Sequence, residues 1–143
     1  SAGILQINNI HGGAIEPAME LLYKIDQNNL IDKSNLDIKN LVNEFVESNE
    51  KVAGFGHKIY EIDPRTELIF KIAKEECIND KFIKIAEKIS EELSLIKNKK
   101  IPVNIDGAIA VILCSFGWES NTGKAVFIIA RTPGLCGQYL NAK

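Results

Sequence analysis

The segment from residue 103 to residue 118 constrains the fold most, because it is apolar on nearly every side once past Asn104 and Asp106. Its length and its lack of period-two alternation favour a buried helix over a central strand at Val111 to Leu113. Its small residues Gly107, Ala108 and Ala110 permit close packing of another helix. A helix that is apolar all round must be covered by other elements of the chain.

Four further stretches carry apolar residues at helical spacing and can supply that cover. These stripes run from Pro17 to about Asn28, from Leu36 to near Asn49, from Leu68 to Ala73 and from Phe82 to Leu93. Lysines 97 to 100 favour the end of the last of these helices. A last segment, Thr122 to Ala142, is broken at Thr132 to Gly134, which predicts two helices meeting at a bend. We therefore predict an all-α fold.

Length and composition limit the class of protein. At 143 residues and 45% hydrophobic content, the chain can bury one core, so a single domain is expected. The net charge of -2 gives no sign excess that would favour nucleic acid or an anionic membrane as a partner. No basic stretch followed by an apolar run opens the chain, and no apolar run approaches the roughly 18 residues of a membrane span.

The cysteines and the first residue add two expectations. Cys77, Cys114 and Cys136 form no CxxC pair, which indicates neither a zinc site nor a disulfide framework and fits a reducing cytoplasm. The chain begins with Ser1 and its apolar periodicity starts almost at once. This suggests that it starts inside a larger domain or follows removed sequence.

The stretch from Lys51 to Pro64 cannot be one regular element. Gly54 and Gly56 bracket Phe55, and an Asp-Pro pair follows, so we expect an irregular loop. The glycines do not complete a dinucleotide fingerprint, because the third glycine of that motif is missing. Beyond the apolar helix, we interpret Phe116 and Trp118 as core residues.

Both histidines of the chain, His11 and His57, stand next to glycine. Glycine lets a ligand approach the backbone closely, and a neutral imidazole can donate or accept a proton near pH 7. A functional use is therefore plausible for each. The alternative is that each histidine caps a helix or satisfies a backbone group at a turn.

Three charged residues lie where helices start or break. Asp106 at the start of the apolar helix would be partly desolvated, which suits a general base, although any first-turn acid is stabilised by the helix dipole. Arg65 and Arg131 lie beside helix breaks and could hold carboxylates bidentately. For Arg65 the alternative is an ion pair with neighbouring acids, which are Glu61, Asp63 and Glu67.

Four motifs, taken in order, resemble the motif series of the citrate synthase superfamily. They are His11-Gly12-Gly13-Ala14, Gly54-Phe55-Gly56-His57 with Asp63-Pro64-Arg65, Asn104-Ile105-Asp106-Gly107, and Ala130-Arg131-Thr132-Pro133-Gly134. The resemblance covers essentially the whole chain but only the C-terminal half or so of a typical member. It implies a citrate synthase-like helical fold that is partial, with the small domain and the dimer-interface helices of the large domain. Residues 1–143 would then be one domain fragment lacking the usual N-terminal part.

The resemblance also implies roles for the residues singled out above. Asp106 would remove a proton from the methyl group of acetyl-CoA while His11 hydrogen-bonds the thioester oxygen, and His57 would protonate or polarise the carbonyl of oxaloacetate. Run backwards, the same groups cleave citryl-CoA. Substrate carboxylates would be held by Arg65 and Arg131. Coenzyme A would lie against the loop residues Val52, Ala53, Gly54, Phe55 and Gly56, and no metal would take part.

Departures from the family pattern favour one kind of member. After the aspartate this chain has Gly107-Ala108-Ile109-Ala110, which looks more like citryl-CoA lyases than like synthases. We therefore expect a homodimeric, cytoplasmic enzyme that cleaves citryl-CoA to acetyl-CoA and oxaloacetate. One alternative is a citrate or 2-methylcitrate synthase that condenses acyl-CoA with oxaloacetate. An alternative of another class is a non-catalytic domain that binds CoA or dimerises.

Overall fold

The computed structural model describes residues 13–28, 35–123 and 125–126, and it is helical as predicted. The helices in chain order are α2 (Ile15–Gln27), α4 (Asn35–Glu47), α5 (Pro64–Glu75), α6 (Lys81–Lys97) and α7 (Ile105–Ser115). The predicted bend at residues 132–134 lies outside the described residues. No helix in the described part of the chain is long and apolar enough to cross a membrane.

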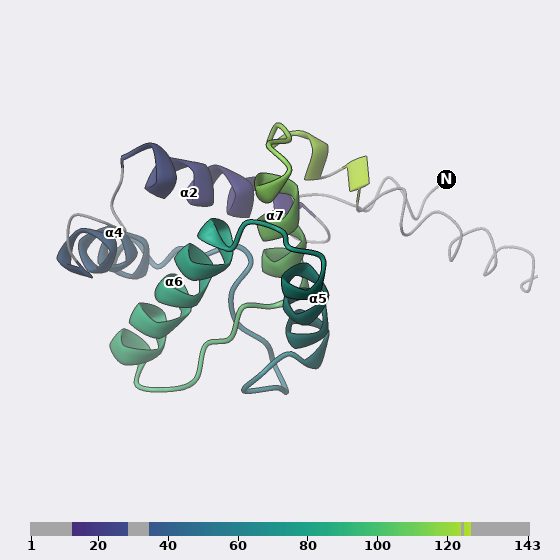
Figure 1. Ribbon diagram of the computed structural model, residues 1–143. Coiled ribbons are helices and arrows are strands. Elements are labelled where there is room, and N and C mark those ends of the chain that lie inside the picture. The colour runs from purple at the N-terminus through teal and green to yellow at the C-terminus, as the bar shows by residue number, and fades with distance from the viewer. Residues whose placement is uncertain (1–12, 29–34, 124, 127–143) are drawn as a thin grey trace, which may run out of the picture.

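Helix α7 lies between the other helices and packs against α2, α5 and α6, while α4 packs on α6 (Figure 1). The core is built from the apolar stripes that the periodicity predicted. Its largest fully buried side chains include Ile15, Met19, Leu22, Ile25, Ile38, Val42, Ile83, Ile85, Ile89, Leu93 and Val111. The prediction of one core covering the apolar helix is therefore confirmed for the described residues.

The start of α7 differs from the prediction because residues 103 and 104 are not helical. Asn104 has an extended backbone, and its side-chain oxygen accepts a hydrogen bond from the Gly107 N–H at 3.1 Å, so it is the N-cap. Val103 instead forms an isolated antiparallel β-bridge with Phe55. The polar cap and the bridge together fix where the helix begins.

The end of α7 also comes earlier than predicted. The helix stops at Ser115, and Gly117 then adopts a φ of +74°, which carries the chain away from the helix axis. Phe116 and Trp118 follow this break with 54% and 48% of their surface exposed. The interpretation of these two aromatics as core is therefore wrong, because they lie beyond the buried length of the helix.

The two helices on either side of the 76–80 turn have ends that the sequence explains. Asp63 caps α5 by accepting a hydrogen bond from the Arg65 N–H at 3.0 Å, and Pro64 occupies the first helical turn. At its other end α6 stops at Lys97, where Asn98 takes a left-handed conformation with φ of +50°. The predicted end of this helix at the lysines is confirmed.

Candidate active site

The loop between α4 and α5 runs alongside the segment that leads into α7. Gly54 and Gly56 have φ values of +90° and +94°, a region that side chains rarely adopt, so the expected irregular loop is present. The Gly56 N–H donates to the Pro102 carbonyl at 2.7 Å, and the Asn104 N–H donates to the Gly54 carbonyl at 3.0 Å. We call residues 52–57 together with residues 101–107 the junction.

Two glycine backbones touch at the centre of the junction. A Cβ atom added to Gly107 would lie 2.2 Å from the Gly54 carbonyl oxygen, far inside van der Waals contact. A Cβ atom added to Gly54 would lie 2.9 Å from the Gly107 Cα and 3.0 Å from the Ala18 side chain of α2. The loop can therefore lie flat on the first turn of α7 only because neither residue has a side chain. The small residue at 107 thus permits close packing as predicted, but its partner here is a loop rather than a helix.

His57 follows the junction directly, and its ring is held by the backbone that comes after it. The Nδ1 atom accepts hydrogen bonds from the Ile59 N–H at 3.0 Å and from the Tyr60 N–H at 3.1 Å. The Tyr60 ring lies beside the imidazole, with centroids 4.7 Å apart. Because Nδ1 is the acceptor, the neutral ring carries its proton on Nε2, and Nε2–H can donate a hydrogen bond to a ligand.

Arg65 and Asp63 form a bidentate ion pair at the start of α5. Arg65 Nε and Nη2 lie 3.1 Å and 3.0 Å from the two carboxylate oxygens. Asp63 is buried, with 1% of its surface exposed, whereas 54% of the Arg65 side chain is exposed. Hydrogen bonding from the Arg65 side chain holds the pKa of Asp63 below its usual value, and nearby His57 adds to this effect. The alternative that Arg65 forms an ion pair with a neighbouring acid is thus confirmed, and its partner is Asp63.

Asp106 lies half-buried in the first turn of α7, two residues after the cap. The pKa of Arg65 is raised, chiefly by its hydrogen bonds to Asp63, and the charge of Asp106 contributes to the increase. Asp106 and Arg65 are therefore close enough to interact electrostatically. The helix dipole stabilises the Asp106 carboxylate at this position, as the alternative interpretation required.

The structure brings several of the predicted site residues into one region, because the junction joins the His57 loop to the Asp106 turn and Arg65 interacts with the latter. The predicted CoA-binding residues 52–56 form one side of the junction. His11 and Arg131 lie outside the described residues, so their predicted roles stay predictions. Among the described residues, no group of three or more His, Cys, Asp or Glu side chains is placed to hold a metal ion.

A cavity of about 660 Å³ opens beside His57 and was not predicted. Its wall includes Phe55, Gly56 and His57, and five lysines line it: Lys51, Lys58, Lys97, Lys99 and Lys100. Two acids, Glu50 and Glu61, also line it, so positive charge is in excess. The lysines come from the loop and from the end of α6, which are far apart in sequence, so the cluster could not be recognised from spacing. Such a cavity suits a ligand that carries several negative charges.

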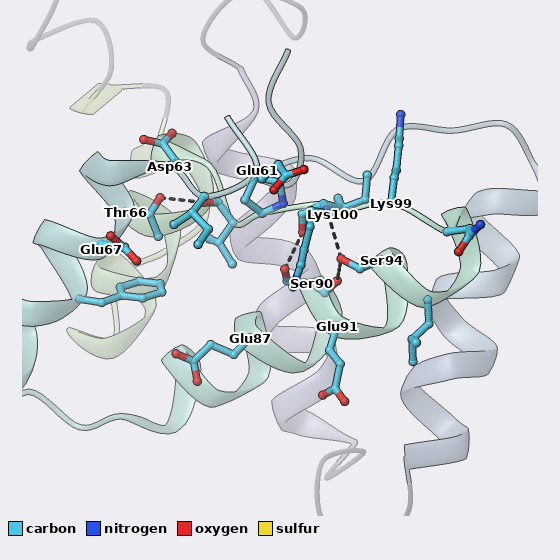
Figure 2. A pocket seen from close by; sticks show the side chains of 17 residues that line it. Glu61, Asp63, Thr66, Glu67, Glu87, Ser90, Glu91, Ser94, Lys99 and Lys100 are labelled. Carbon is cyan, nitrogen blue, oxygen red and sulfur yellow. Dashed lines mark hydrogen bonds between the residues drawn. The ribbon is translucent and has the colours of Figure 1, made fainter. Parts of the chain in front are cut away.

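Three polar residues of the site were also missed by sequence reasoning: Thr66, Ser90 and Ser94. Thr66 Oγ1 donates to the Val103 carbonyl at 2.7 Å, and Ser90 Oγ donates to the Ile101 carbonyl at 2.5 Å (Figure 2). Ser94 Oγ accepts from the Ile101 N–H at 2.9 Å. These hydroxyls anchor the 101–104 segment to α5 and α6. Hydroxyl residues inside amphipathic helices give no sequence signal of such a function.

The fold and the site define a helical domain that places a histidine loop against the capped start of a buried helix. The family model "Citrate synthase, C-terminal domain" matches residues 5–143, and the chain belongs to the citrate synthase family. This confirms the resemblance drawn from the motifs.

Individual relatives agree with this assignment. Citryl-CoA lyase from Hydrogenobacter thermophilus is 37% identical with a TM-score of 0.80, and the match covers 94% of this chain and 50% of that one. The citrate synthase of Helicobacter pylori (strain J99) is 30% identical, with 98% of this chain and 34% of that protein covered. Citrate synthase from Thermoplasma acidophilum was solved as a ternary complex with carboxymethyl coenzyme A and oxaloacetate. It is 25% identical with a TM-score of 0.65, over 90% of this chain and 34% of that one. The chain thus spans a third to a half of the length of these three proteins.

Proposed function

We propose that the protein containing this chain breaks the carbon-carbon bond of citryl-CoA to give acetyl-CoA and oxaloacetate. The observation that carries the proposal is the junction, which ties the His57 loop to the Asp106 turn beside a lysine-lined cavity. Among the solved structures, the greater identity to a citryl-CoA lyase, 37%, than to the Thermoplasma acidophilum citrate synthase, 25%, favours the cleavage direction. The Gly-Ala-Ile-Ala sequence after Asp106 supports the same direction.

His57 would act on the oxygen that changes between hydroxyl and carbonyl. In condensation, Nε2–H donates a hydrogen bond to the carbonyl oxygen of oxaloacetate and stabilises the negative charge that develops there as the new carbon-carbon bond forms, and this oxygen then takes a proton from water. In cleavage, the hydroxyl group of citryl-CoA first gives its proton to water, and the same hydrogen bond stabilises the alkoxide until the carbon-carbon bond breaks and the carbonyl of oxaloacetate forms. The two backbone donors on Nδ1 support this role, because they leave Nε2–H as the ring donor that can bind a ligand.

Asp106 would act on the acyl carbon. In condensation its carboxylate removes a proton from the methyl group of acetyl-CoA, and in cleavage its protonated form gives a proton to the carbon of the released enolate. Its half-buried position at the start of α7 keeps it near the junction, and the N–H groups of the first turn favour its charged form, which is the form that acts as base in condensation. His11 would stabilise the thioester oxygen of the enol, and Arg65 and Arg131 would bind substrate carboxylates.

Coenzyme A would bind along residues 52–56, with its phosphate groups in the lysine-lined cavity. The loop presents backbone with little side-chain bulk at Gly54 and Gly56, which suits close contact with a flat group such as adenine. The excess of lysines over glutamates in the cavity wall matches the negative charges of the phosphates. The Thermoplasma acidophilum relative was solved with a coenzyme A derivative, which supports this choice of ligand.

A citrate or 2-methylcitrate synthase is the second candidate, favoured by the curated relatives, which include the citrate synthase of Helicobacter pylori. A synthase hydrolyses the citryl-CoA that it forms and so releases free CoA thiol from acyl-CoA plus oxaloacetate. A lyase forms oxaloacetate from citryl-CoA. A thiol-release assay with acetyl-CoA and propionyl-CoA therefore separates the two candidates.

The first experiment is cleavage of citryl-CoA by the 143-residue chain, with oxaloacetate followed through a coupled dehydrogenase. We expect turnover in the wild type and a loss of roughly 100-fold or more in His57→Ala and Asp106→Asn, as for removal of a donor to a developing oxyanion and of a general base. Turnover that both variants retain would contradict the proposed roles. No turnover at all, with CoA still bound, would favour the non-catalytic CoA-binding alternative or show that residues outside this chain complete the site.

We also propose that the active form is a homodimer, as the family resemblance implies. The exposed apolar side chains Leu68 and Ile72, one turn apart on α5, are available for such a contact. Sedimentation velocity at micromolar concentration should show a dimer. A stable monomer that cleaves citryl-CoA would contradict this part of the proposal.

A further inference from the structure

Asn104 is hydrogen-bonded to both halves of the junction. Its side-chain oxygen accepts from the Gly107 N–H at 3.1 Å, its side-chain nitrogen donates to the Gly56 carbonyl at 3.0 Å, and its backbone N–H donates to the Gly54 carbonyl at 3.0 Å. One residue thus joins the peptide before His57 to the helical turn that contains Asp106. An ordinary N-cap needs only the first of these three contacts.

The segment that carries Asn104 is itself fixed on both sides. The Ile101 N–H and carbonyl bind two serines of α6, and the Val103 carbonyl accepts from Thr66 of α5 (Figure 2). The Pro102 carbonyl accepts from the Gly56 N–H. Each residue from 101 to 104 therefore has at least one backbone group bound to another element. Hydrogen bonds of this kind are directional, so the segment has little freedom to shift relative to α5 and α6.

From these contacts we propose that Asn104 is a positioning residue that fixes the orientation of the His57 ring relative to Asp106. This inference rests on the proposed function of His57 and Asp106. The Gly56 carbonyl that Asn104 binds belongs to the peptide bond leading into His57. If this carbonyl turns, the backbone at 57–60 turns with it, and the two N–H donors no longer meet Nδ1. Asn104 would thus control both the ring orientation and which nitrogen carries the proton.

Two substitutions separate positioning from capping. Asn104→Asp keeps an oxygen that accepts from Gly107, and its charge favours the helix start, but it places a carboxylate oxygen against the Gly56 carbonyl. Asn104→Ser keeps a good cap and removes the donor to Gly56 without adding charge. Asn79→Ser is the matched control, because Asn79 Oδ1 accepts from the Lys81 N–H at 2.9 Å at the start of α6, away from the junction.

The first readout is the ¹⁵N NMR spectrum of the imidazole nitrogens of His57, recorded with the ring neutral. The chain contains two histidines, so His57→Ala assigns the signals. In the wild type and in Asn79→Ser we expect the pattern of a single tautomer with the proton on Nε2. In both Asn104 variants we expect the shifts to move toward those of a mixture of tautomers.

The second readout is kinetic. We expect the Asn104 variants to lose roughly 10- to 100-fold in kcat for citryl-CoA cleavage, as for a small misplacement of a catalytic group, with little change in KM. Asn79→Ser should keep the wild-type kcat. Circular dichroism and thermal unfolding establish that each variant is folded before it is compared.

The outcomes decide between positioning and mere support of the fold. Single-tautomer spectra in both folded Asn104 variants would overturn the proposal, and so would unfolding of both variants while Asn79→Ser stays folded. Mixed-tautomer spectra with the expected loss of kcat would support it. If the wild type cleaves no citryl-CoA, the spectra still test whether Asn104 orients the ring, so failure of the proposed function can be told apart from failure of this inference.

Discussion

The helical core and the junction are held together by different forces. In the core, side chains such as Met19, Ile85 and Ile89 are fully buried, and their stabilisation follows the apolar area removed from water, with no fixed direction. In the junction, glycine backbones touch and directional hydrogen bonds cross between segments far apart in sequence. The core therefore supplies stability, while the junction determines the angles at which His57 and Asp106 are presented.

The largest expected effect comes from placing a methyl group in the junction. Gly107→Ala would bring a Cβ atom to 2.2 Å from the Gly54 carbonyl oxygen, and because both partners are backbone, neither can move aside cheaply. We expect the free energy of unfolding to fall by about 3 kcal/mol, the upper part of the usual range for overpacking. Urea denaturation measures this change.

Gly117→Ala is the matched control for that substitution. Gly117 has a φ of +74°, but a Cβ atom there would meet nothing within 4 Å. The cost should be the conformational penalty alone, about 1 kcal/mol. Equal losses in the two variants would mean that the close contact between the glycines does not constrain the protein, and the contrast between core and junction would be lost.

The core was the part of the fold that sequence could predict. Helical periodicity located the helices, because a stripe of apolar residues buries the same face wherever the partner helix lies. The ends of α7 were misplaced, since its start depends on a β-bridge between Phe55 and Val103 and its end on the conformation of Gly117. Neither feature changes the apolar pattern from which the helix was predicted.

The candidate site was predicted by residue type but not by geometry. The glycines around His57 and the helix start at Asp106 singled out these groups, and the ion-pair alternative for Arg65 was foreseen. The hydrogen bond from Asn104 to Gly56 joins residues 48 apart in sequence, so no local pattern reveals it. The tautomer of His57 likewise depends on how the backbone after it turns.

Asp63 lies at the edge of the junction, and its substitution should lower the free energy of unfolding by an intermediate amount. Asp63→Ala removes the cap of α5 and the partner of Arg65, so we expect a loss of about 2 kcal/mol in the free energy of unfolding. Asp63→Asn keeps an oxygen for the Arg65 N–H and should lose about 1 kcal/mol. Denaturation at pH 7 compares them, and a larger loss in the asparagine variant would contradict the assigned contacts.

The contribution of Asp63 to the free energy of unfolding should decrease as the pH is lowered. Hydrogen bonding from Arg65 lowers the pKa of Asp63 in the folded protein, so its stabilising contribution is present above the unfolded value of about 3.9. It is lost as the pH falls through the folded pKa. Wild type and Asp63→Asn should therefore converge in stability at low pH, whereas a constant difference down to acid pH would rule out this linkage.

The smallest effect on stability is expected from removing a single hydroxyl group at the edge of the core. Tyr23 of α2 donates a hydrogen bond to the Trp118 carbonyl at 2.5 Å, and its ring packs edge-on against Phe82 with centroids 5.6 Å apart. Tyr23→Phe keeps the ring and removes the hydroxyl. We expect a loss of about 1 kcal/mol at pH 7, because one hydrogen bond is removed while the packing stays.

Alkaline titration distinguishes this hydroxyl from its neighbour Cys114. Burial raises the pKa of Tyr23 to about 12, above its unfolded value of about 10, so its contribution is present below pH 10 and is lost as the pH rises toward 12. Burial also raises the pKa of Cys114 to about 12, from an unfolded value of about 8.5, so the thiol causes a loss that begins at lower pH. The free energy of unfolding is measured from pH 8 to pH 11. Tyr23→Phe should still lose stability from about pH 8.5 upward, because Cys114 remains. Cys114→Ala should lose stability only above about pH 10, because only Tyr23 remains. If Tyr23→Phe leaves the whole alkaline profile unchanged, the phenol is not shielded in the folded protein, and the core is more open around α2 than its packing indicates.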